Sequence, residues 1–431
     1  MRYLLHHTLS QNIAALYGIQ FVRSVLPLIT VPYLARVLGP GGWGLIAFVQ
    51  AFGRYSTLVV EYGFGISGTR EVARHRDDSH TLAEFVAGVL GARLVLACTC
   101  VGFAIVVRSH VELLQRNPLY FWAGLFAAVA QAFSMTWYFQ GLERMRVAAT
   151  IEAAAGVLAT LGIFWLVGDP ASGWVVLGVN GMCSFLAAMV GLGLAYRDLP
   201  IQRPRLISVR NALRAGWAMF LFTGSVTLYT AGNSFILGLF VSPVVVGYYA
   251  GAEKIARALL ALLSPVAAAL YPRLSFLAKH QRMKAARLAR AGVCLMGSGG
   301  VVLGVFVLCL APQLIGLLLG PGFESAIPVL RVFSLLPPLI ALSNAFGLQW
   351  MLPLGMDRAF NLIVLLAGIV NLSLAWVLAP RFGQMGMAWA VVAAELLVTI
   401  GAFSVLRLQS ADPFSLAVVT EEPLPQRRLI D

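Results

Sequence analysis

The sequence predicts an all-α, polytopic membrane protein with about 12 transmembrane helices in two six-helix lobes around a central cavity. Of its 431 residues, 59% are hydrophobic and only 11% are charged, which is more apolar surface than a soluble core could bury. The apolar runs recur along the chain at about 20 residues each, the length at which an α-helix crosses a bilayer. No soluble catalytic module of ordinary size fits between them, so we expect a protein that is not an enzyme.

Charges, prolines and glycines divide the apolar sequence into individual spans. The first span is expected to be retained, because its apolar stretch is longer than that of a cleavable signal peptide. The predicted spans are 11–35, 42–63, 84–107, 119–140, 148–167, 174–195, 215–240, 248–271, 291–319, 326–352, 360–379 and 385–406.

Positive side chains are distributed unequally between the two ends of these spans. Of the 31 Lys and Arg residues, 21 lie on the side of the N-terminus, 4 on the opposite side and 6 inside spans. By the positive-inside rule both termini are cytoplasmic. The net charge of +13 therefore indicates topology and contact with anionic membrane lipids, and we expect no nucleic-acid partner.

The basic linker 196–214 divides the chain into an N-terminal lobe, 1–195, and a C-terminal lobe, 215–406. A cytoplasmic tail, 407–431, follows. Each lobe contains an even number of spans, so the lobes would be parallel repeats related by an axis along the membrane normal.

One short motif supports this internal repeat. Pro40 and Gly44, between the first two spans, match Pro243 and Gly247, between spans seven and eight, at a constant offset of 203 residues. The repeat places a cavity between the two lobes.

Six basic residues lie inside predicted spans, where a charge costs roughly 2.5 to 3.5 kcal/mol even on the most lenient insertion scale. Cations at that depth favour a cavity that binds an anion, and the planar fork of arginine suits a phosphate. Pairing with a carboxylate, or extension of the side chain to an interface, is the alternative for each of them. The candidate anion-binding residues are Arg23, Arg54, Arg93, Lys254, Arg257 and Arg331.

Two carboxylates inside spans are candidates for ion coupling. Glu395 sits midway along the last span, where it could exchange a proton during transport. Glu253 neighbours Lys254, so a structural ion pair is the simpler interpretation there. We expect Glu61 and Glu152, near cytoplasmic span ends, to be solvated at the interface.

Prolines interrupt several spans and are candidate hinges, because each removes a backbone donor and favours a kink. They are Pro27, Pro32, Pro265, Pro337 and Pro338. The five cysteines have no metal-ligand spacing involving histidine, so we expect no metal site and no cofactor.

Several motifs together resemble those of bacterial polysaccharide transporters. These are the O-antigen and exopolysaccharide flippases of the multidrug/oligosaccharidyl-lipid/polysaccharide exporter superfamily. The motifs are Asn12-Ile-Ala-Ala-Leu-Tyr-Gly-Ile-Gln20, Leu26-Pro-Leu-Ile-Thr-Val-Pro-Tyr-Leu-Ala-Arg-Val-Leu-Gly-Pro40, Glu61-Tyr-Gly-Phe64, Thr69-Arg-Glu-Val-Ala73, Ala261-Leu-Leu-Ser-Pro-Val266, Tyr271-Pro-Arg-Leu-Ser275, Gly320-Pro-Gly-Phe-Glu324 and Ala326-Ile-Pro-Val-Leu-Arg331.

The resemblance implies a flippase that moves an undecaprenyl-pyrophosphate-linked oligosaccharide across the bacterial inner membrane. It implies a cavity lined by basic residues of spans one, two and eight, where Arg23, Arg54, Lys254 and Arg257 lie. It also implies polysaccharide polymerase and chain-length proteins as partners.

Two alternatives stay open. A cation-coupled multidrug exporter of the same superfamily shares the architecture, but it would favour an acidic cavity. A non-transporting scaffold that docks glycan-assembly enzymes would tolerate replacement of the intramembrane cations.

Overall fold

The computed structural model describes residues 2–414, apart from the side chains of residues 2–25, 27, 28, 222, 225, 226 and 228–230. It divides into two compact units. The first unit comprises Met1–Lys254, Pro312–Val329 and Leu372–Met387. The second comprises Ile255–Ala311, Leu330–Asn371 and Ala388–Asp431. The lobes expected on either side of the linker 196–214 are a different partition and stay a prediction.

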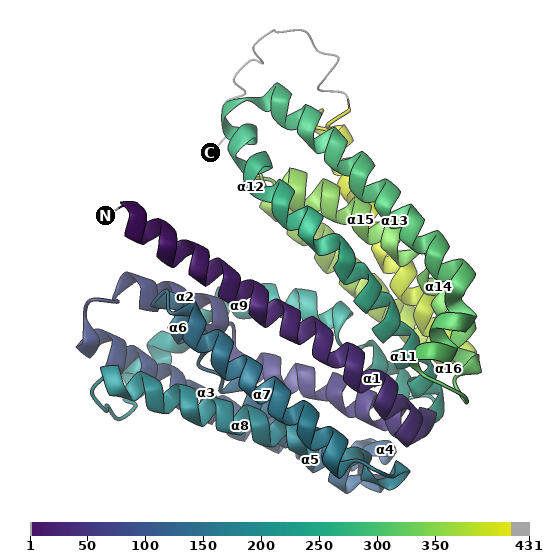
Figure 1. Cartoon of the computed structure of the whole chain (residues 1–431), viewed down its shortest axis with the longest axis horizontal. Helices are drawn as coiled ribbons and strands as arrows, with labels where there is room; N and C mark the ends of the chain where they lie inside the picture. Colours follow the sequence, from purple (N-terminus) through teal and green to yellow (C-terminus); the bar gives the residue numbers. More distant parts are fainter. Residues whose placement is uncertain (1, 415–431) are drawn as a thin grey trace. The chain divides into compact units, whose positions relative to one another are not determined.

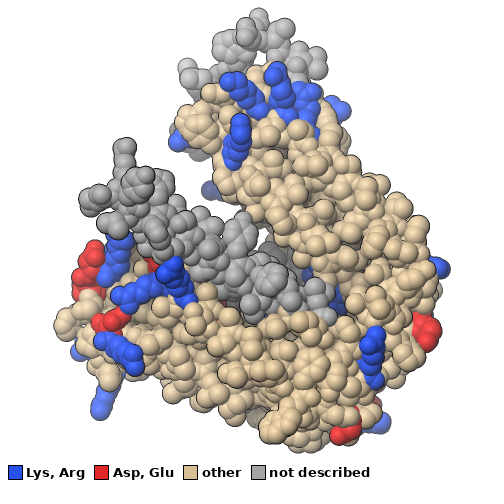
Figure 2. Space-filling view, viewed as in Figure 1, with Lys and Arg blue, Asp and Glu red and all other residues tan. Residues whose placement is uncertain are grey.

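The all-α fold class is confirmed. Among the residues that the structure describes, eight helical segments are long and apolar enough to cross a membrane. Their outer surfaces are apolar: Phe103 of the third helix is 65% exposed and Trp165 of the seventh 86% exposed. Figure 2 shows broad surfaces without charged side chains between clusters of Lys and Arg. Such surfaces are stable only against lipid, because water would not solvate them.

The helices of the first unit follow one another with short connections, and α5, α7 and α8 lie side by side (Figure 1). Their bounds are α1 Arg2–Glu61, α2 Phe64–Arg74, α3 Ser79–His110, α4 Glu112–Arg116, α5 Pro118–Ala132, α6 Thr136–Gly141, α7 Met145–Leu166, the 3₁₀ turn η1 Pro170–Ser172, α8 Gly173–Asp198, α9 Leu206–Thr230, α10 Asn233–Gly238 and α11 Pro243–Leu260. The last residues of α11 belong to the second unit.

The second half of the chain contains longer helices and more irregular turns. Its elements are the 3₁₀ turn η2 Ala261–Leu263, α12 Ser264–His280, α13 Arg282–Leu318, the 3₁₀ turn η3 Glu324–Ala326, α14 Ile327–Phe333, α15 Leu336–Phe346, the π-helical turn η4 Gly347–Met351 and α16 Asp357–Leu408. The core of the second unit joins α12, α13, α15 and α16, with Trp350 fully buried within it. The Trp350 indole donates a hydrogen bond to the Ala411 carbonyl at 2.8 Å, which attaches the end of the described chain to this core.

Two long helices each contain a pair of predicted spans, separated by one non-helical glycine. Gly39 divides α1 with φ 63°, and Gly383 divides α16 with φ 55°. Pro40 disfavours the helical conformation for the residue before it, and glycine alone accepts positive φ without strain. Spans predicted as separate therefore continue almost without a loop.

Residues of the sequence repeat meet each other inside the first unit. A Cβ atom on Gly44 would overlap the carbonyl oxygen of Pro243, and one on Gly247 would overlap the carbonyl oxygen of Pro40. We call these four residues the Gly–Pro crossing. In each contact the glycine of one repeat meets the proline of the other. Two copies related by a two-fold axis produce this reciprocal pattern. The residues that the sequence repeat aligns are therefore in contact, while the division into two repeated lobes stays a prediction.

Further contacts near the Gly–Pro crossing join α1 and α11 to the segment Pro312–Val329. The Arg36 guanidinium donates a hydrogen bond to the Leu317 carbonyl at 2.6 Å, and the aliphatic part of the same side chain lies against Gly320. Tyr248 packs edge-on against Phe323, with ring centroids 6.3 Å apart. The segment Pro312–Val329 is held within the first unit by these contacts.

Candidate functional site

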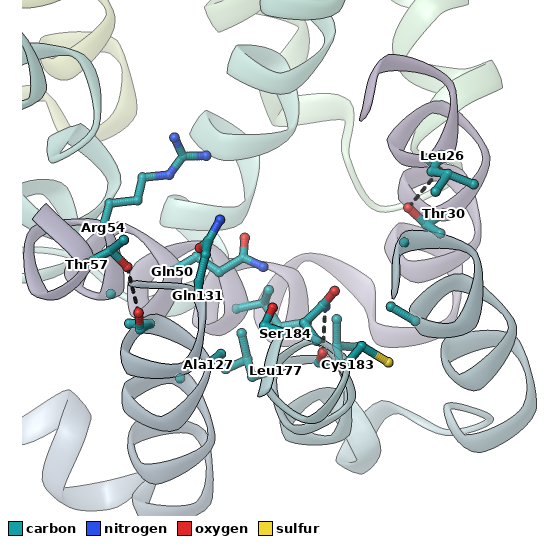
Figure 3. Close-up of a pocket in the computed structure, with 18 of the residues that line it drawn as sticks. Leu26, Thr30, Gln50, Arg54, Thr57, Ala127, Gln131, Leu177, Cys183 and Ser184 are labelled. Atoms are coloured by element: carbon teal, nitrogen blue, oxygen red, sulfur yellow. Dashed lines mark hydrogen bonds between the residues drawn. The ribbon is translucent and has the colours of Figure 1, made fainter. Parts of the chain in front are cut away.

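A cavity of about 810 Å³ lies inside the first unit. Helices α1, α5, α7 and α8 form its wall, and α9 and α11 contribute Thr223, Thr227 and Lys254. The Thr57 hydroxyl of α1 donates to the Ala128 carbonyl of α5 at 3.0 Å and joins two of these helices (Figure 3). The volume is within the range of about 300–1,000 Å³ usual for ligand sites.

One face of α7 lines the cavity, with three small residues between Glu152 and Thr160 and with Ile163 beyond them. Glu152, Ala155, Gly156, Ala159 and Thr160 recur at helical spacing and all contact the cavity, so they share one side of the helix. Alanine and glycine leave space that larger residues would fill, and the polar residues stand at the two ends of this strip. The face of α7 is therefore shaped to leave room for a ligand.

The cavity wall carries positively charged, negatively charged and neutral polar side chains. Its charged residues are Arg54, Glu61, Glu152 and Lys254. Its neutral polar residues are Thr30, Gln50, Thr57, Gln131, Thr160, Asn180, Ser184, Thr223 and Thr227. Figure 3 shows Gln50 and Gln131 extending from α1 and α5, with Arg54 one turn further along α1. The described wall is mixed, whereas the sequence predicted a cationic one.

A break in the helical backbone positions one of these carboxylates. α5 ends at Ala132 and α6 begins at Thr136. The hydroxyl groups of Ser134 and Thr136, 2.8 Å apart, both reach Glu152 Oε1, at 3.4 and 3.0 Å. Glu152 thus lies at the cavity wall with one oxygen held in place. We had expected Glu61 and Glu152 to be solvated at the interface, and the structure places both at the cavity.

Arg93 supports the same break from the opposite side. It is 1% exposed, its Nη1 donates to the Ser134 carbonyl at 3.0 Å, and its guanidinium lies 5.8 and 5.7 Å from the ring centroids of Phe64 and Trp137. The backbone carbonyl at this break accepts one hydrogen bond from the guanidinium, and the two aromatic rings contribute cation–π contacts inside the core. The structure therefore does not bring Arg93 to the cavity wall with Arg54.

The other predicted cations lie in different parts of the fold. Lys254 contacts the cavity from α11. Arg257, on the same helix, and Arg331, on α14, are exposed and belong to the second unit. Arg257 is close enough to Glu395 of α16 to act on its carboxyl electrostatically.

The remaining candidates are Arg23, the prolines predicted as hinges and the glutamates predicted to couple an ion. The side chains of Arg23 and Pro27 lie outside the described part of the chain, and Pro32 lies within the helical part of α1. Pro265 follows the 3₁₀ turn η2, in the first turn of α12. Pro337 and Pro338 begin α15 after α14 ends at Phe333. A hinge role at any of them stays a prediction, as does ion coupling at Glu253 or Glu395.

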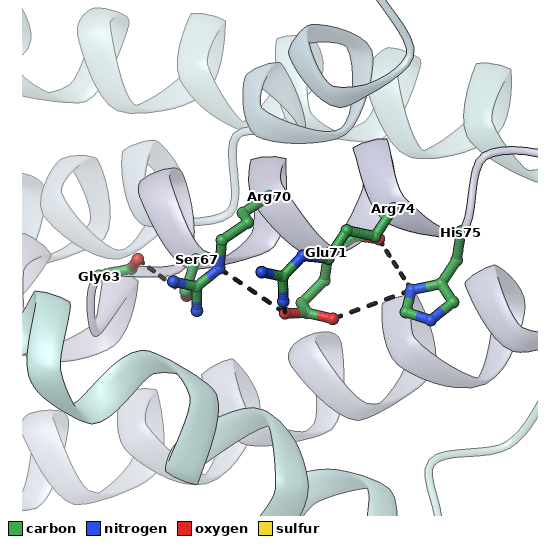
Figure 4. Close-up of polar contacts among 6 residues, drawn as sticks. All are labelled: Gly63, Ser67, Arg70, Glu71, Arg74 and His75. Carbon is green, nitrogen blue, oxygen red and sulfur yellow. Dashed lines mark hydrogen bonds and ion pairs between the residues drawn. The ribbon is translucent and has the colours of Figure 1, made fainter.

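A polar cluster on α2 contains none of the cavity residues. Glu71 lies 3.7 Å from Arg70, 3.2 Å from Arg74 and 3.8 Å from His75, and the Ser67 hydroxyl donates to the Gly63 carbonyl at 3.0 Å (Figure 4). The two arginines and the histidine are exposed, and ion pairs in water contribute at most about 1 kcal/mol. These arginines belong to the surface and are suitable controls for the cavity cations.

The sequence analysis missed the neutral wall of the cavity. Gln50, Gln131, Asn180 and Ser184 were not identified as site residues. A signal was present for the two glutamines, because polar side chains are uncommon in membrane spans and each lies one helical turn from Ala or Gly on the same face.

Comparisons with known proteins agree with this architecture. A family model described as polysaccharide biosynthesis protein matches residues 9–278. A protein of Escherichia coli (strain K12) named as an O-antigen transporter is 30% identical over 395 residues, covering 91% of this chain and 95% of the relative.

Two solved structures share the fold. A structure of the lipid II flippase MurJ matches with TM-score 0.69 and 11% identity, over 94% of this chain and 90% of that one. An inward-facing structure of a multidrug resistance MATE family transporter of the MOP superfamily matches with TM-score 0.66 and 16% identity, over 92% and 98%.

Proposed function

This chain belongs to the polysaccharide biosynthesis protein family, and we propose that it is a flippase for a lipid-linked oligosaccharide. Its substrate is an undecaprenyl-pyrophosphate-linked repeat unit, carried across the bacterial inner membrane for surface polysaccharide synthesis. The observation that carries this proposal is the 810 Å³ polar cavity inside a unit whose outer surface is apolar. A cavity lined by charged and neutral polar side chains in a lipid-facing helical protein favours transport of a hydrophilic group.

The cavity offers groups for both hydrophilic parts of that substrate. Arg54 and Lys254 are cations that can bind the pyrophosphate. Amides and hydroxyls on the same wall can bind sugar hydroxyl groups. The prenyl chain would stay in the lipid, which the apolar outer faces of the helices contact.

The Gly–Pro crossing supports transport by alternating access. On the predicted topology it lies at the periplasmic end of the spans, where the two copies of the repeat meet. Its contacts involve backbone atoms packed without side chains between them, so the two copies can meet and separate there without moving large side chains. Coupling of this cycle to an ion through Glu253 or Glu395 is part of the proposal.

Reconstituted protein tests the proposal. Translocation of a fluorescent undecaprenyl-pyrophosphate oligosaccharide is measured in proteoliposomes for the wild type, Arg54→Ala and the control Arg70→Ala. We expect transport by the wild type and by the control, and loss of at least about tenfold for Arg54→Ala, since removing a charge-assisted hydrogen bond costs about 1.5–3 kcal/mol. A folded wild type without transport, with or without an imposed ion gradient, would reject the flippase function.

Glu61 and Glu152 favour one second candidate, a multidrug exporter of the same superfamily. Carboxylates at the cavity wall could bind a cationic drug. The same proteoliposomes, loaded with a cationic dye, decide between the two functions. Transport of the dye by the wild type that is abolished in Glu152→Gln would support the exporter. A wild type that translocates the lipid but does not transport the dye would support the flippase.

A further inference from the structure

We propose that the wall formed by α5, α7 and α8 is the saccharide-recognition site, in which Gln131, Glu152 and Asn180 bind sugar hydroxyls and set which oligosaccharide is carried. This inference rests on the proposed flippase function. It divides the cavity into two parts, because the pyrophosphate is left to Arg54 and Lys254.

Small residues on α7 leave space at the cavity wall in which sugars could bind. Between Glu152 and Thr160, the α7 face presents only Ala155, Gly156 and Ala159 to the cavity. Eight residues of α-helix span about 12 Å, so this strip is long enough for a chain of sugars to lie along it. Ala127 and Ala128 of α5 continue the shallow surface.

The chemistry of the wall fits hydroxyl groups better than phosphate. Amide side chains both donate and accept hydrogen bonds, and a carboxylate accepts two from neighbouring hydroxyls. A carboxylate beside a pyrophosphate would repel it. Glu152 therefore places the sugars, and not the phosphates, next to α7.

Two of the proposed ligands are already oriented. Asn180 Nδ2 donates to the Val176 carbonyl at 2.7 Å, which fixes the plane of its amide. Glu152 Oε1 accepts from Thr136 at 3.0 Å and from Ser134 at 3.4 Å. Groups held in place before binding lose less freedom when the ligand arrives.

Arg93 acts on this site as a positioning residue. Its guanidinium holds the Ser134 carbonyl at 3.0 Å from inside the core, and the Ser134 and Thr136 hydroxyls hold Glu152. The α5–α6 break thus connects a buried cation to a carboxylate at the cavity wall. This gives the buried cation an effect on sugar recognition although it contacts no substrate.

Binding to two lipids separates sugar recognition from pyrophosphate recognition. Purified full-length protein is titrated with undecaprenyl pyrophosphate alone and with the same lipid carrying an oligosaccharide. Gln131→Ala, Asn180→Ala and Glu152→Gln are expected to weaken binding of the sugar-bearing lipid about tenfold each and to leave the sugar-free lipid within about twofold. Arg54→Ala is expected to weaken both lipids.

Matched controls lie outside the cavity. Asn117 donates to the carbonyl four residues earlier, at 2.9 Å, as Asn180 does, and Glu84 accepts from a serine hydroxyl at 2.8 Å, as Glu152 does. Asn117→Ala and Glu84→Gln are expected to change neither affinity. Thr136→Val, which keeps the side-chain shape but removes one hydrogen bond to Glu152, is expected to weaken only the sugar-bearing lipid, by a few fold.

The outcomes separate the two proposals. Equal losses for both lipids in the wall variants, or no loss for either, would overturn the saccharide site while leaving the flippase function intact. A wild type that binds neither lipid would overturn the proposed function and this inference with it. A selective loss for the sugar-bearing lipid, with Arg54→Ala affecting both, supports the division of the cavity.

Discussion

Two of the predicted intramembrane arginines whose side chains are described, both in the first unit, lie in opposite surroundings. Arg93 is closed in between Phe64 and Trp137 with a backbone carbonyl as its partner. Arg54 is exposed at the wall of the 810 Å³ cavity. Both lie in spans where a charge is costly. An intramembrane charge can therefore be accommodated in two ways, by packing and hydrogen bonding inside the core or by exposure at the wall of a cavity.

Arg93 and Arg54 should therefore have different roles. A buried cation that satisfies a freed carbonyl stabilises the fold, because its loss leaves that carbonyl unpaired. Arg54 is exposed at the cavity wall, so its replacement should cost less stability than replacement of a buried cation. Stability and transport should therefore respond in opposite order to mutation at the two sites.

Replacing Arg93 should have the largest effect on folding. Arg93→Ala leaves a cavity and an unpaired Ser134 carbonyl, so we expect a loss of about 3 kcal/mol in stability. Thermal unfolding of purified protein in detergent measures it, with Arg54→Ala as the comparison. An unchanged melting temperature for Arg93→Ala, together with lost transport, would break the distinction drawn here.

Charge-conserving variants should sharpen the same distinction. Lysine keeps the charge but lacks the planar fork that donates two hydrogen bonds and stacks on aromatic rings. Arg93→Lys should lower the melting temperature, whereas Arg54→Lys should keep it and reduce translocation about tenfold. The opposite order, measured by unfolding and by proteoliposome transport, would assign the structural role to Arg54.

Variants of the Gly–Pro crossing test whether transport depends on its close backbone contacts. Gly44→Ala and Gly247→Ala would force backbones apart, at about 1–3 kcal/mol for overpacking, and should reduce translocation with the cavity untouched. Gly102→Ala is the control, since nothing lies within 4 Å of the added carbon; there the change should stabilise the helix by up to about 1 kcal/mol. Wild-type transport by both crossing variants would remove the crossing from the mechanism.

The smallest effect concerns the start of α3, the helix that carries Arg93. Asp78 caps it, accepting from the Thr81 hydroxyl at 2.6 Å and from the Thr81 and His80 amides at 3.1 Å. The hydrogen bonds from Thr81 hold the pKa of Asp78 below its ordinary value of 3.8. The cap is therefore present above that value and lost as the pH falls through the lower pKa of the folded state.

Hydrogen exchange of the first α3 amides at different pH values measures this loss. The amides of the first turn should exchange faster, relative to their intrinsic rates, as Asp78 becomes protonated. Asp78→Asn removes the titration but keeps an acceptor, so its protection should not depend on pH in this range. A pH dependence that survives in Asp78→Asn would place the titrating group elsewhere.

The all-α membrane fold class and the approximate place of individual apolar helices could be predicted from the sequence. α7 at Met145–Leu166 lies within a few residues of the predicted span 148–167, because apolar length and polar breaks are local properties that a bilayer imposes on any helix. Pro40, Gly44, Pro243 and Gly247 could be aligned by their spacing, whereas the close backbone contacts that require the two glycines appear only in the structure.

The surroundings of each polar residue in a span depend on the packing of the helices. Periodicity shows that residues share a side of a helix, but it does not say whether that side meets a packed neighbour or a cavity. Arg93 and Arg54 were equivalent in sequence, and Glu152 appeared to lie at an interface. The break after α5, the aromatic rings around Arg93 and the small residues of α7 separated them, because burial depends on contacts between residues that are far apart in the chain.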